Sequence, residues 1–208
     1  LPLYNGVTRM EIGLSPDAKL QKPAAFTVKK PILFYGGSIS QGGCASRPSN
    51  SYASILCRRL NAPLFNLGFS GCSKLERYMA ELIASLDLTA LVIDTTNTTL
   101  EEKRVRHEAF LLKVRERRPR LPIIVTCRAD WKSDPVTHRA RRAVAMRTWK
   151  NAQKRGDKRV LFADMKNAFG KDYDLCTVDG CHPNDLGFMR MADCFDPHVR
   201  QAVRLARR

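Results

Sequence analysis

The chain has 208 residues, 44% of them hydrophobic, and carries 36 Lys and Arg against 20 Asp and Glu, a formal net charge of +16. This length allows one globular domain with a full core and leaves too little chain for a second complete domain. No apolar run approaches the roughly 20 residues that a membrane-spanning helix needs, so we expect a soluble protein without a membrane span.

Residues 1–30 have a different texture from the rest of the chain. Apolar residues alternate weakly there (Val7, Met10, Ile12), and Gly and Pro interrupt them, which predicts a short strand or two followed by a linker. We therefore divide the chain into an N-terminal strand and linker segment, residues 1–30, and a domain, residues 31–208. The sequence begins at Leu1 rather than Met, so we expect that a signal peptide or another upstream segment has been removed. The compartment stays open, with a secreted or periplasmic location as one alternative.

From residue 31 onward, short apolar runs alternate with helical patterns. The expected strands cover residues 32–35, 64–67, 91–93, 123–125 and 160–162, and the expected helices lie near residues 49–61, 73–86, 100–118, 135–154 and 184–206. This alternation is typical of a parallel sheet covered on both faces. We predict an α/β fold of three layers (α/β/α) with a five-stranded, mostly parallel, doubly wound sheet of the flavodoxin-like type. In such a sheet the ligand crevice lies at the carboxyl ends of the strands.

A glycine-dense turn follows the first predicted core strand. Residues 35–43 read YGGSISQGG, which places Ser38 at the carboxyl end of a buried strand. Glycines let the backbone turn sharply there, so a serine on this turn faces the crevice with its own N–H available to an oxyanion. The alternative is an ordinary glycine turn or a phosphate-binding loop, although the Lys and the spacing of a Walker loop are missing.

The next two strands also end in polar loops. The second strand leads into residues 66–71 (NLGFSG), where Gly71 can direct a backbone N–H into the same crevice. The third strand leads into residues 94–99 (DTTNTT), where Asn97 either donates to a substrate oxygen or caps the helix that starts near Leu100. Thr98 and Thr99 suit the cap equally well.

An acid and an imidazole lie three residues apart near the C-terminus. Residues 179–183 read DGCHP, so Asp179 can accept the Nδ1 proton of His182 and leave Nε2 to take a serine proton. The alternative is a turn in which Asn184 or Asp185 caps the last helix and His182 has no role.

The four loops together resemble the sequence blocks of the SGNH (GDSL-like) hydrolase superfamily. The stretches FYGGSISQGGCASRP (residues 34–48), NLGFSG (66–71) and DGCHP (179–183) look like a bacterial subgroup that often carries an N-terminal β-sandwich. Residues 1–7 (LPLYNGV) resemble the last strands of such a sandwich. The resemblance thus covers nearly the whole chain.

The resemblance implies a role for each matching residue. Ser38 matches the nucleophile, Asp179 and His182 match the other members of a catalytic triad, and the N–H groups of Ser38 and Gly71 match the oxyanion hole. The third block departs from the pattern, because the position of the expected Asn is taken by Thr98 while Asn97 lies one residue early. Either the loop shifts so that Asn97 reaches the hole, or one donor is missing.

The resemblance therefore implies a carboxylic ester hydrolase with a serine nucleophile, a small-molecule or carbohydrate ester as substrate, and neither a metal nor an organic cofactor. Acetylated carbohydrate, such as acetylxylan, is the expected substrate class. Two alternatives stay open: a weakened or non-catalytic SGNH-like protein that binds an anionic polymer, and an acyltransferase that uses the same serine.

The positive charge and the cysteines bear on these alternatives. Residues 101–160 hold 19 Lys or Arg against 7 Asp or Glu, but they follow helical patterns without a nucleic-acid motif, so we interpret them as solvated helix faces and expect no specific nucleic-acid partner. Of the 7 cysteines, Cys44, Cys72 and Cys181 flank the predicted site, yet none takes the place of Ser38 in the first sequence block. The spacing of Cys176 and Cys181 also permits a small loop disulfide.

Overall fold

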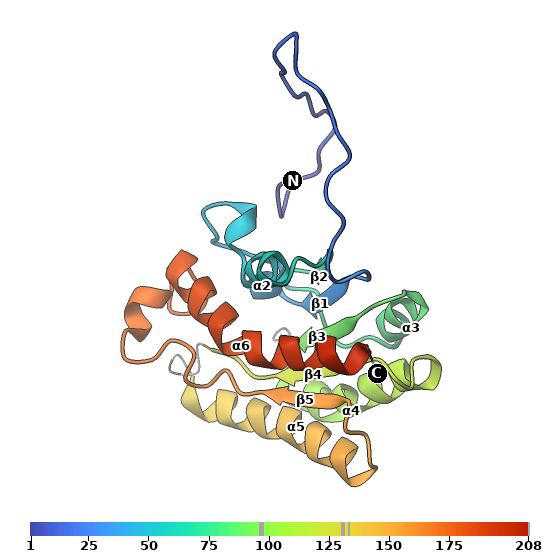
Figure 1. Ribbon diagram of the computed structural model, residues 1–208. Coiled ribbons are helices and arrows are strands. Elements are labelled where there is room, and N and C mark those ends of the chain that lie inside the picture. Colours follow the sequence, from blue (N-terminus) through green and yellow to red (C-terminus); the bar gives the residue numbers. More distant parts are fainter. Residues whose placement is uncertain (96–97, 130–131, 133, 208) are drawn as a thin grey trace.

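The computed structural model describes residues 1–95, 98–129, 132 and 134–207. At its centre lies a five-stranded sheet in the order β2-β1-β3-β4-β5, in which every neighbouring pair is parallel (Figure 1). The strands are β1 (Ile32–Gly36), β2 (Leu64–Gly68), β3 (Ala90–Asp94), β4 (Ile123–Thr126) and β5 (Val160–Ala163). The predicted doubly wound α/β fold is confirmed.

Helices cover both faces of this sheet. They are α1 (Ser38–Gln41), α2 (Tyr52–Leu60), α3 (Arg77–Ser85), α4 (Leu100–Arg117), α5 (Pro135–Lys154) and α6 (Asp185–Ala206), with short 3₁₀ turns η1 (Pro48–Asn50) and η3 (Tyr173–Cys176). Helices α2 and α6 pack together on one face, whereas α4 packs between α3 and α5 on the other. None of the described helices has an apolar stretch of the length that crossing a bilayer requires.

The side chains of β1 show why the sheet is buried on both sides. Ile32 and Phe34 belong to the core under α2 and α6, while Leu33 and Tyr35 belong to the core under α3 and α4. All four are fully buried. Because successive side chains of a strand point to opposite faces, a continuous apolar run is what a strand between two helical layers requires.

The strand register brings the chemically interesting loops to one edge. Gly36 at the end of β1 pairs with Gly68 of β2 and with Asp94 of β3. A side chain at Gly68 would lie 2.2 Å from the backbone nitrogen of Gln41, so the glycine lets α1 pack directly on the end of β2. The loops after β1, β2 and β3 therefore open at the same carboxyl edge.

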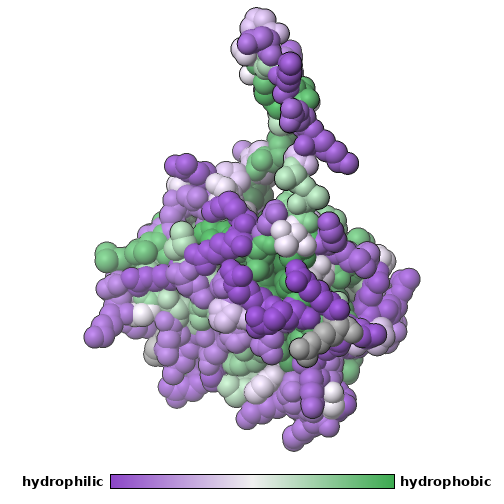
Figure 2. Space-filling model, in the orientation of Figure 1, coloured by the Kyte–Doolittle hydropathy of each residue, from purple (hydrophilic) through white to green (hydrophobic). Residues whose placement is uncertain are grey.

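The N-terminal segment differs from its prediction. The first strand begins at Ile32, so the strands expected within residues 1–30 are not formed there. Figure 1 shows this segment projecting from the domain, and Figure 2 shows apolar residues on its surface. Its exposed apolar side chains are Leu1, Tyr4, Val7, Met10, Ile12, Leu14, Leu20 and Phe26. A strand needs a partner for its backbone hydrogen bonds, and the edge of the sheet next to this segment does not supply one.

Candidate active site

Ser38 is the first residue of α1, a helix of 4 residues that follows β1 directly. Its neighbour Gly37 is the N-cap, and the side chain of Ser38 is half-buried at the carboxyl edge of the sheet. In the first turn of a helix the backbone N–H groups have no partner within the helix. The turn therefore presents both a hydroxyl and donor groups at one point.

His182 and Asp179 reach Ser38 from the loop before α6. The Oγ of Ser38 lies 2.9 Å from Nε2 of His182, and Nδ1 of His182 lies 2.7 Å from Oδ2 of Asp179. The other carboxylate oxygen of Asp179 accepts the N–H groups of Cys181 and His182, at 2.9 and 2.6 Å. Asn184 caps α6 separately by accepting the N–H of Gly187, so capping does not depend on His182.

These contacts determine the ionisation of Asp179. Donation from the backbone N–H of His182, and then from its side chain, lowers the pKa of Asp179 to about 2. The carboxylate is therefore ionised at any pH near neutrality, and an ionised partner at Nδ1 holds the imidazole in the tautomer that leaves Nε2 free to accept a proton.

A buried polar network lies directly behind the turn of Ser38. Asp94, only 5% exposed, accepts the hydroxyl proton of Tyr52 at 2.8 Å and that of Ser40 at 3.1 Å. Ser40 is two residues after Ser38 in α1, so the network connects α1 to α2 and to the end of β3. Burial raises the pKa of Asp94, while both hydroxyl donors favour its ionised form. Sequence reasoning singled out neither Ser40 nor Tyr52 for this role.

Gly71 lies on the exposed loop after β2. Its φ of +73° is in the left-handed region, which glycine adopts without strain. The loop is joined to α1 by Gln41, whose side-chain oxygen accepts the N–H of Ser70 at 2.9 Å. The contacts thus bring the Gly71 loop beside the turn of Ser38.

The loop after β3 shows which residue caps α4. Asn97 lies outside the described residues, whereas Thr98 is buried and its carbonyl accepts a hydrogen bond from Arg141 at 2.7 Å. Thr99 is the N-cap of α4, in a capping box with Glu102. Thr99, and not Thr98, therefore caps this helix.

The N-terminal segment contributes a contact that the sequence did not predict. The hydroxyl of Tyr4 donates to the carbonyl of Ser38 at 3.4 Å, and the side-chain amide of Gln41 donates to the carbonyl of Leu3 at 2.9 Å. Gln41 thus holds both Leu3 and Ser70. A weakly patterned residue such as Tyr4 carries no signal of this proximity in the sequence.

Within the basic stretch, Lys103 is an exception to the predicted solvated face. It is buried, and its ammonium donates to the carbonyl of Thr95 at 3.0 Å. Burial is the largest cause that lowers its pKa, to about 8, and the charge of Asp94 opposes that effect. Lys103 and Arg141 therefore bind the two ends of the loop that contains the third block.

The 7 cysteines are free thiols, including Cys176 and Cys181. Cys44 and Cys72 are exposed, and Cys181 accepts a contact from the guanidinium of Arg128 at 2.8 Å. The ligand atoms of Asp179, Cys181 and His182 lie within 4.8 Å of one another, a spacing that a metal ion can bridge. His182 already bonds to Asp179 through Nδ1 and to Ser38 through Nε2, so a metal there would compete with the triad geometry.

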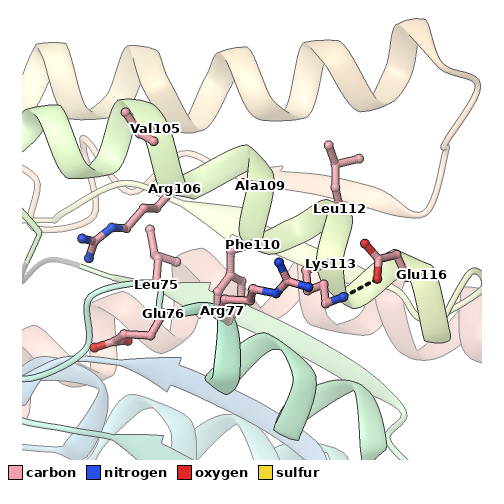
Figure 3. A pocket seen from close by; sticks show the side chains of 10 residues that line it. All are labelled: Leu75, Glu76, Arg77, Val105, Arg106, Ala109, Phe110, Leu112, Lys113 and Glu116. Carbon is pink, nitrogen blue, oxygen red and sulfur yellow. Dashed lines mark hydrogen bonds and ion pairs between the residues drawn. The ribbon is translucent and has the colours of Figure 1, made fainter.

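The hollow in Figure 3 lies away from this site. It occupies about 610 Å³ between α3 and α4 and is lined by Leu75, Glu76, Arg77, Val105, Arg106, Ala109, Phe110, Leu112, Lys113 and Glu116. Its apolar side chains come from Leu75, just before α3, and from α4, and charged side chains of α4 and of the start of α3 lie around them. Neither Ser38 nor His182 belongs to its lining.

Comparison with known sequences shows which family the chain resembles. Residues 29–200 match the model of the GDSL-like Lipase/Acylhydrolase family. Among curated protein sequences, none matches the chain significantly.

Solved structures share the fold over most of the chain. A putative GDSL-like lipase from Bacteroides ovatus is 32% identical, with a TM-score of 0.80, over 92% of this chain and 58% of the other. The salicylyl-acyltransferase SsfX3 of a tetracycline biosynthetic pathway is 21% identical, with a TM-score of 0.70, over 83% of this chain and 54% of the other. A family two carbohydrate esterase from Clostridium thermocellum is 17% identical, with a TM-score of 0.68, over 89% of this chain and 67% of the other. The chain thus spans little more than half the length of the first two.

Proposed function

Because the chain belongs to the GDSL-like lipase/acylhydrolase family, we propose that it is a serine esterase that hydrolyses O-acyl esters. Ser38 is the nucleophile, His182 the general base and acid, and Asp179 the group that orients and stabilises the imidazolium. The observation that supports these roles is the continuous pair of contacts from Ser38 Oγ to His182 Nε2, 2.9 Å, and from His182 Nδ1 to Asp179, 2.7 Å.

The reaction proceeds in two halves. His182 Nε2 takes the hydroxyl proton of Ser38 while Oγ attacks the ester carbonyl, and the tetrahedral intermediate then expels the alcohol, which receives that proton. Water next gives a proton to His182 and attacks the acyl-serine, which releases the acid and restores Ser38. The N–H groups of Ser38 and Gly71, with the Asn97 side chain as third donor, stabilise the oxyanion in both halves.

Acetylated carbohydrate, acetylxylan-like, is the substrate class that we propose. Among proteins that share the fold, one is an esterase active on acetylated mannans and another is a family two carbohydrate esterase. The exposure of the site agrees with a polymeric substrate, because the side chains of His182 and Asp179 are 30% and 48% exposed.

Labelling with a serine-reactive phosphonate, followed by peptide mapping, tests the nucleophile. We expect the label on Ser38, and we expect Ser38→Ala to fold normally while losing both the label and the hydrolysis of a short-chain aryl ester. The matched control is Ser70→Ala, an exposed serine on the neighbouring loop, which should keep both. A label that persists on Ser40 or Ser70 in the Ser38→Ala protein would contradict the assignment.

Two further measurements separate the alternatives. Iodoacetamide should leave the activity intact, whereas inactivation in proportion to one modified thiol, with Ser38→Ala still active, would indicate a cysteine nucleophile instead. Product analysis with competing alcohol acceptors distinguishes hydrolysis from acyl transfer, because an acyltransferase passes the acyl group to the alcohol in preference to water.

A further inference from the structure

A small cavity with cationic residues lies at the carboxyl end of β4. It has a volume of about 110 Å³ and is lined by Cys127, Arg128, Pro135, His138, Arg139, Arg142 and Lys166. Water takes about 30 Å³ per molecule in the liquid, so the cavity has room for one polar group with a few waters and not for a whole sugar ring. Four of its described lining residues are Arg or Lys, and none is Asp or Glu.

Three separate segments bring these cations together. Arg128 follows β4, Arg139 and Arg142 come from the first turns of α5, and Lys166 follows β5. The N-terminus of a helix carries a partial positive charge, which at α5 is partly offset by the carboxylate of its N-cap, Asp134. Among the described carboxylates near the cavity, Asp164 is held by Arg142 through Nε at 2.9 Å and through Nη2. That pair fixes the orientation of Arg142.

Arg128 connects the cavity to the proposed active site. Its Nη2 lies 2.8 Å from Sγ of Cys181, the residue before His182. In the sheet, β3 alone separates β4 from β1, so the carboxyl ends of β1 and β4 lie about 10 Å apart. A ligand of one or two sugar units can therefore place an ester at Ser38 and a second group in the cavity.

We propose that this cavity binds a carboxylate of the substrate, so that the preferred substrates are acyl esters of acidic sugars. Arginine recognises a carboxylate through two parallel N–H donors, and the volume suits one such group. This inference rests on the proposed esterase function and extends it, because the acyl ester reacts at Ser38 while the acid group of the same sugar chain determines which esters are preferred.

A pair of substrates that differ in one group tests the inference. Methyl β-D-glucuronoside monoacetate and methyl β-D-glucoside monoacetate differ in a carboxylate against a hydroxymethyl group. We expect kcat/KM to favour the acidic substrate by about tenfold at low ionic strength, and we expect the preference to fall as salt is added. The double variant Arg139→Gln/Lys166→Gln should reduce the ratio about tenfold. Lys150→Gln, an exposed cation on α5 outside the cavity, is the matched control and should leave the ratio within about twofold of the unmodified protein.

The outcomes separate this inference from the proposed function. If the protein hydrolyses p-nitrophenyl acetate and both sugar esters, and the ratio of kcat/KM between the two sugar esters is near one, the carboxylate site is overturned and the esterase proposal stands. If no ester is hydrolysed, the esterase proposal fails. An NMR titration of the protein with methyl β-D-glucuronoside then shows whether the cavity binds a carboxylate. Shifts at Arg128, Arg139 and Lys166 with this ligand, absent with methyl β-D-glucoside, would support the anion site, and their absence would overturn it.

Discussion

Replacing Tyr52 by Phe removes one hydroxyl from the network behind Ser38 while keeping the ring in place. The ring of Tyr52 contacts Phe34 at 5.6 Å and Phe195 at 5.2 Å between centroids, contacts that a phenyl ring retains. The lost interactions are the 2.8 Å hydrogen bond to the carboxylate of Asp94 and the 3.2 Å hydrogen bond with the hydroxyl of Ser40. The substitution therefore removes one donor to a buried carboxylate, together with its contact to the neighbouring Ser40.

The expected loss follows from the burial of Asp94. A hydrogen bond to a charged group contributes about 1.5 to 3 kcal/mol, and the upper part of that range applies where water does not replace the donor. Asp94 is 5% exposed, so we expect Tyr52→Phe to lower the free energy of unfolding by about 2 to 3 kcal/mol at pH 7.5. The ammonium of Lys103 and the guanidinium of Arg128 favour the same carboxylate and limit the loss.

The loss should also depend on pH. Burial raises the pKa of Asp94 above its unfolded value of about 3.9, so the folded protein binds more protons between the two values and stability falls as pH rises through that window. Removing the Tyr52 donor raises the pKa of Asp94 in the folded protein further, so the pH range over which stability falls extends to higher pH. The destabilisation by Tyr52→Phe should therefore be smaller at pH 5 than at pH 7.5.

Urea unfolding at both pH values measures the effect, with Tyr78→Phe as the control because Tyr78 is 64% exposed. Turnover of a short-chain aryl ester should fall as well, since Ser40 and the α1 turn lose part of their support. A loss of stability that is equal at the two pH values, or no larger than that of Tyr78→Phe, would refute the role of the Asp94 network.

Five other substitutions test the surroundings of the site. Asn97→Ala should weaken transition-state stabilisation by about 2.7 to 4 kcal/mol in acylation kinetics with little effect on folding, whereas a silent Asn97→Ala with a faster Thr98→Asn would assign the family position to Thr98. The lowered pKa of Lys103 means that the unfolded chain binds more protons than the folded protein between pH 8 and about 10.5, so the stability of the unmodified protein should rise with pH there. Lys103→Met should remove this rise. Identical pH profiles of the two proteins in urea unfolding would contradict this. Gly68→Ala should cost about 1 to 3 kcal/mol of stability and disturb α1, because its Cβ meets the backbone of Gln41. Gly71→Ala has open space around its Cβ, so it should leave α1 undisturbed and cost only the strain of the left-handed backbone, about 1 to 2 kcal/mol.

The fold follows from features that neighbouring residues carry by themselves. Strands β1, β3, β4 and β5 are built on continuous apolar runs between helical patterns, a local property of burial on both faces, whereas the edge strand β2 is less buried. Parallel strands place their carboxyl ends at one edge, so Ser38, Gly71 and the Asp179 loop were predictable as neighbours. The short spacing of Asp179 and His182 likewise made their contact foreseeable, because three residues of loop limit how far the two side chains can separate.

Tertiary structure alone decided where distant residues meet and which charges are buried. Ser40, Tyr52 and Asp94 come from three elements, and their hydrogen bonds depend on the packing of α2 against the end of β3. Lys103 has the same helical spacing as its exposed neighbours, and only its position above the β3 loop buries it. The strands expected before Ile32 do not form, because alternating apolar residues make a strand only where a neighbouring strand completes the backbone hydrogen bonds. The cations around Arg128 gather for the same kind of reason, since loops after β4 and β5 and the start of α5 converge in space and not in sequence.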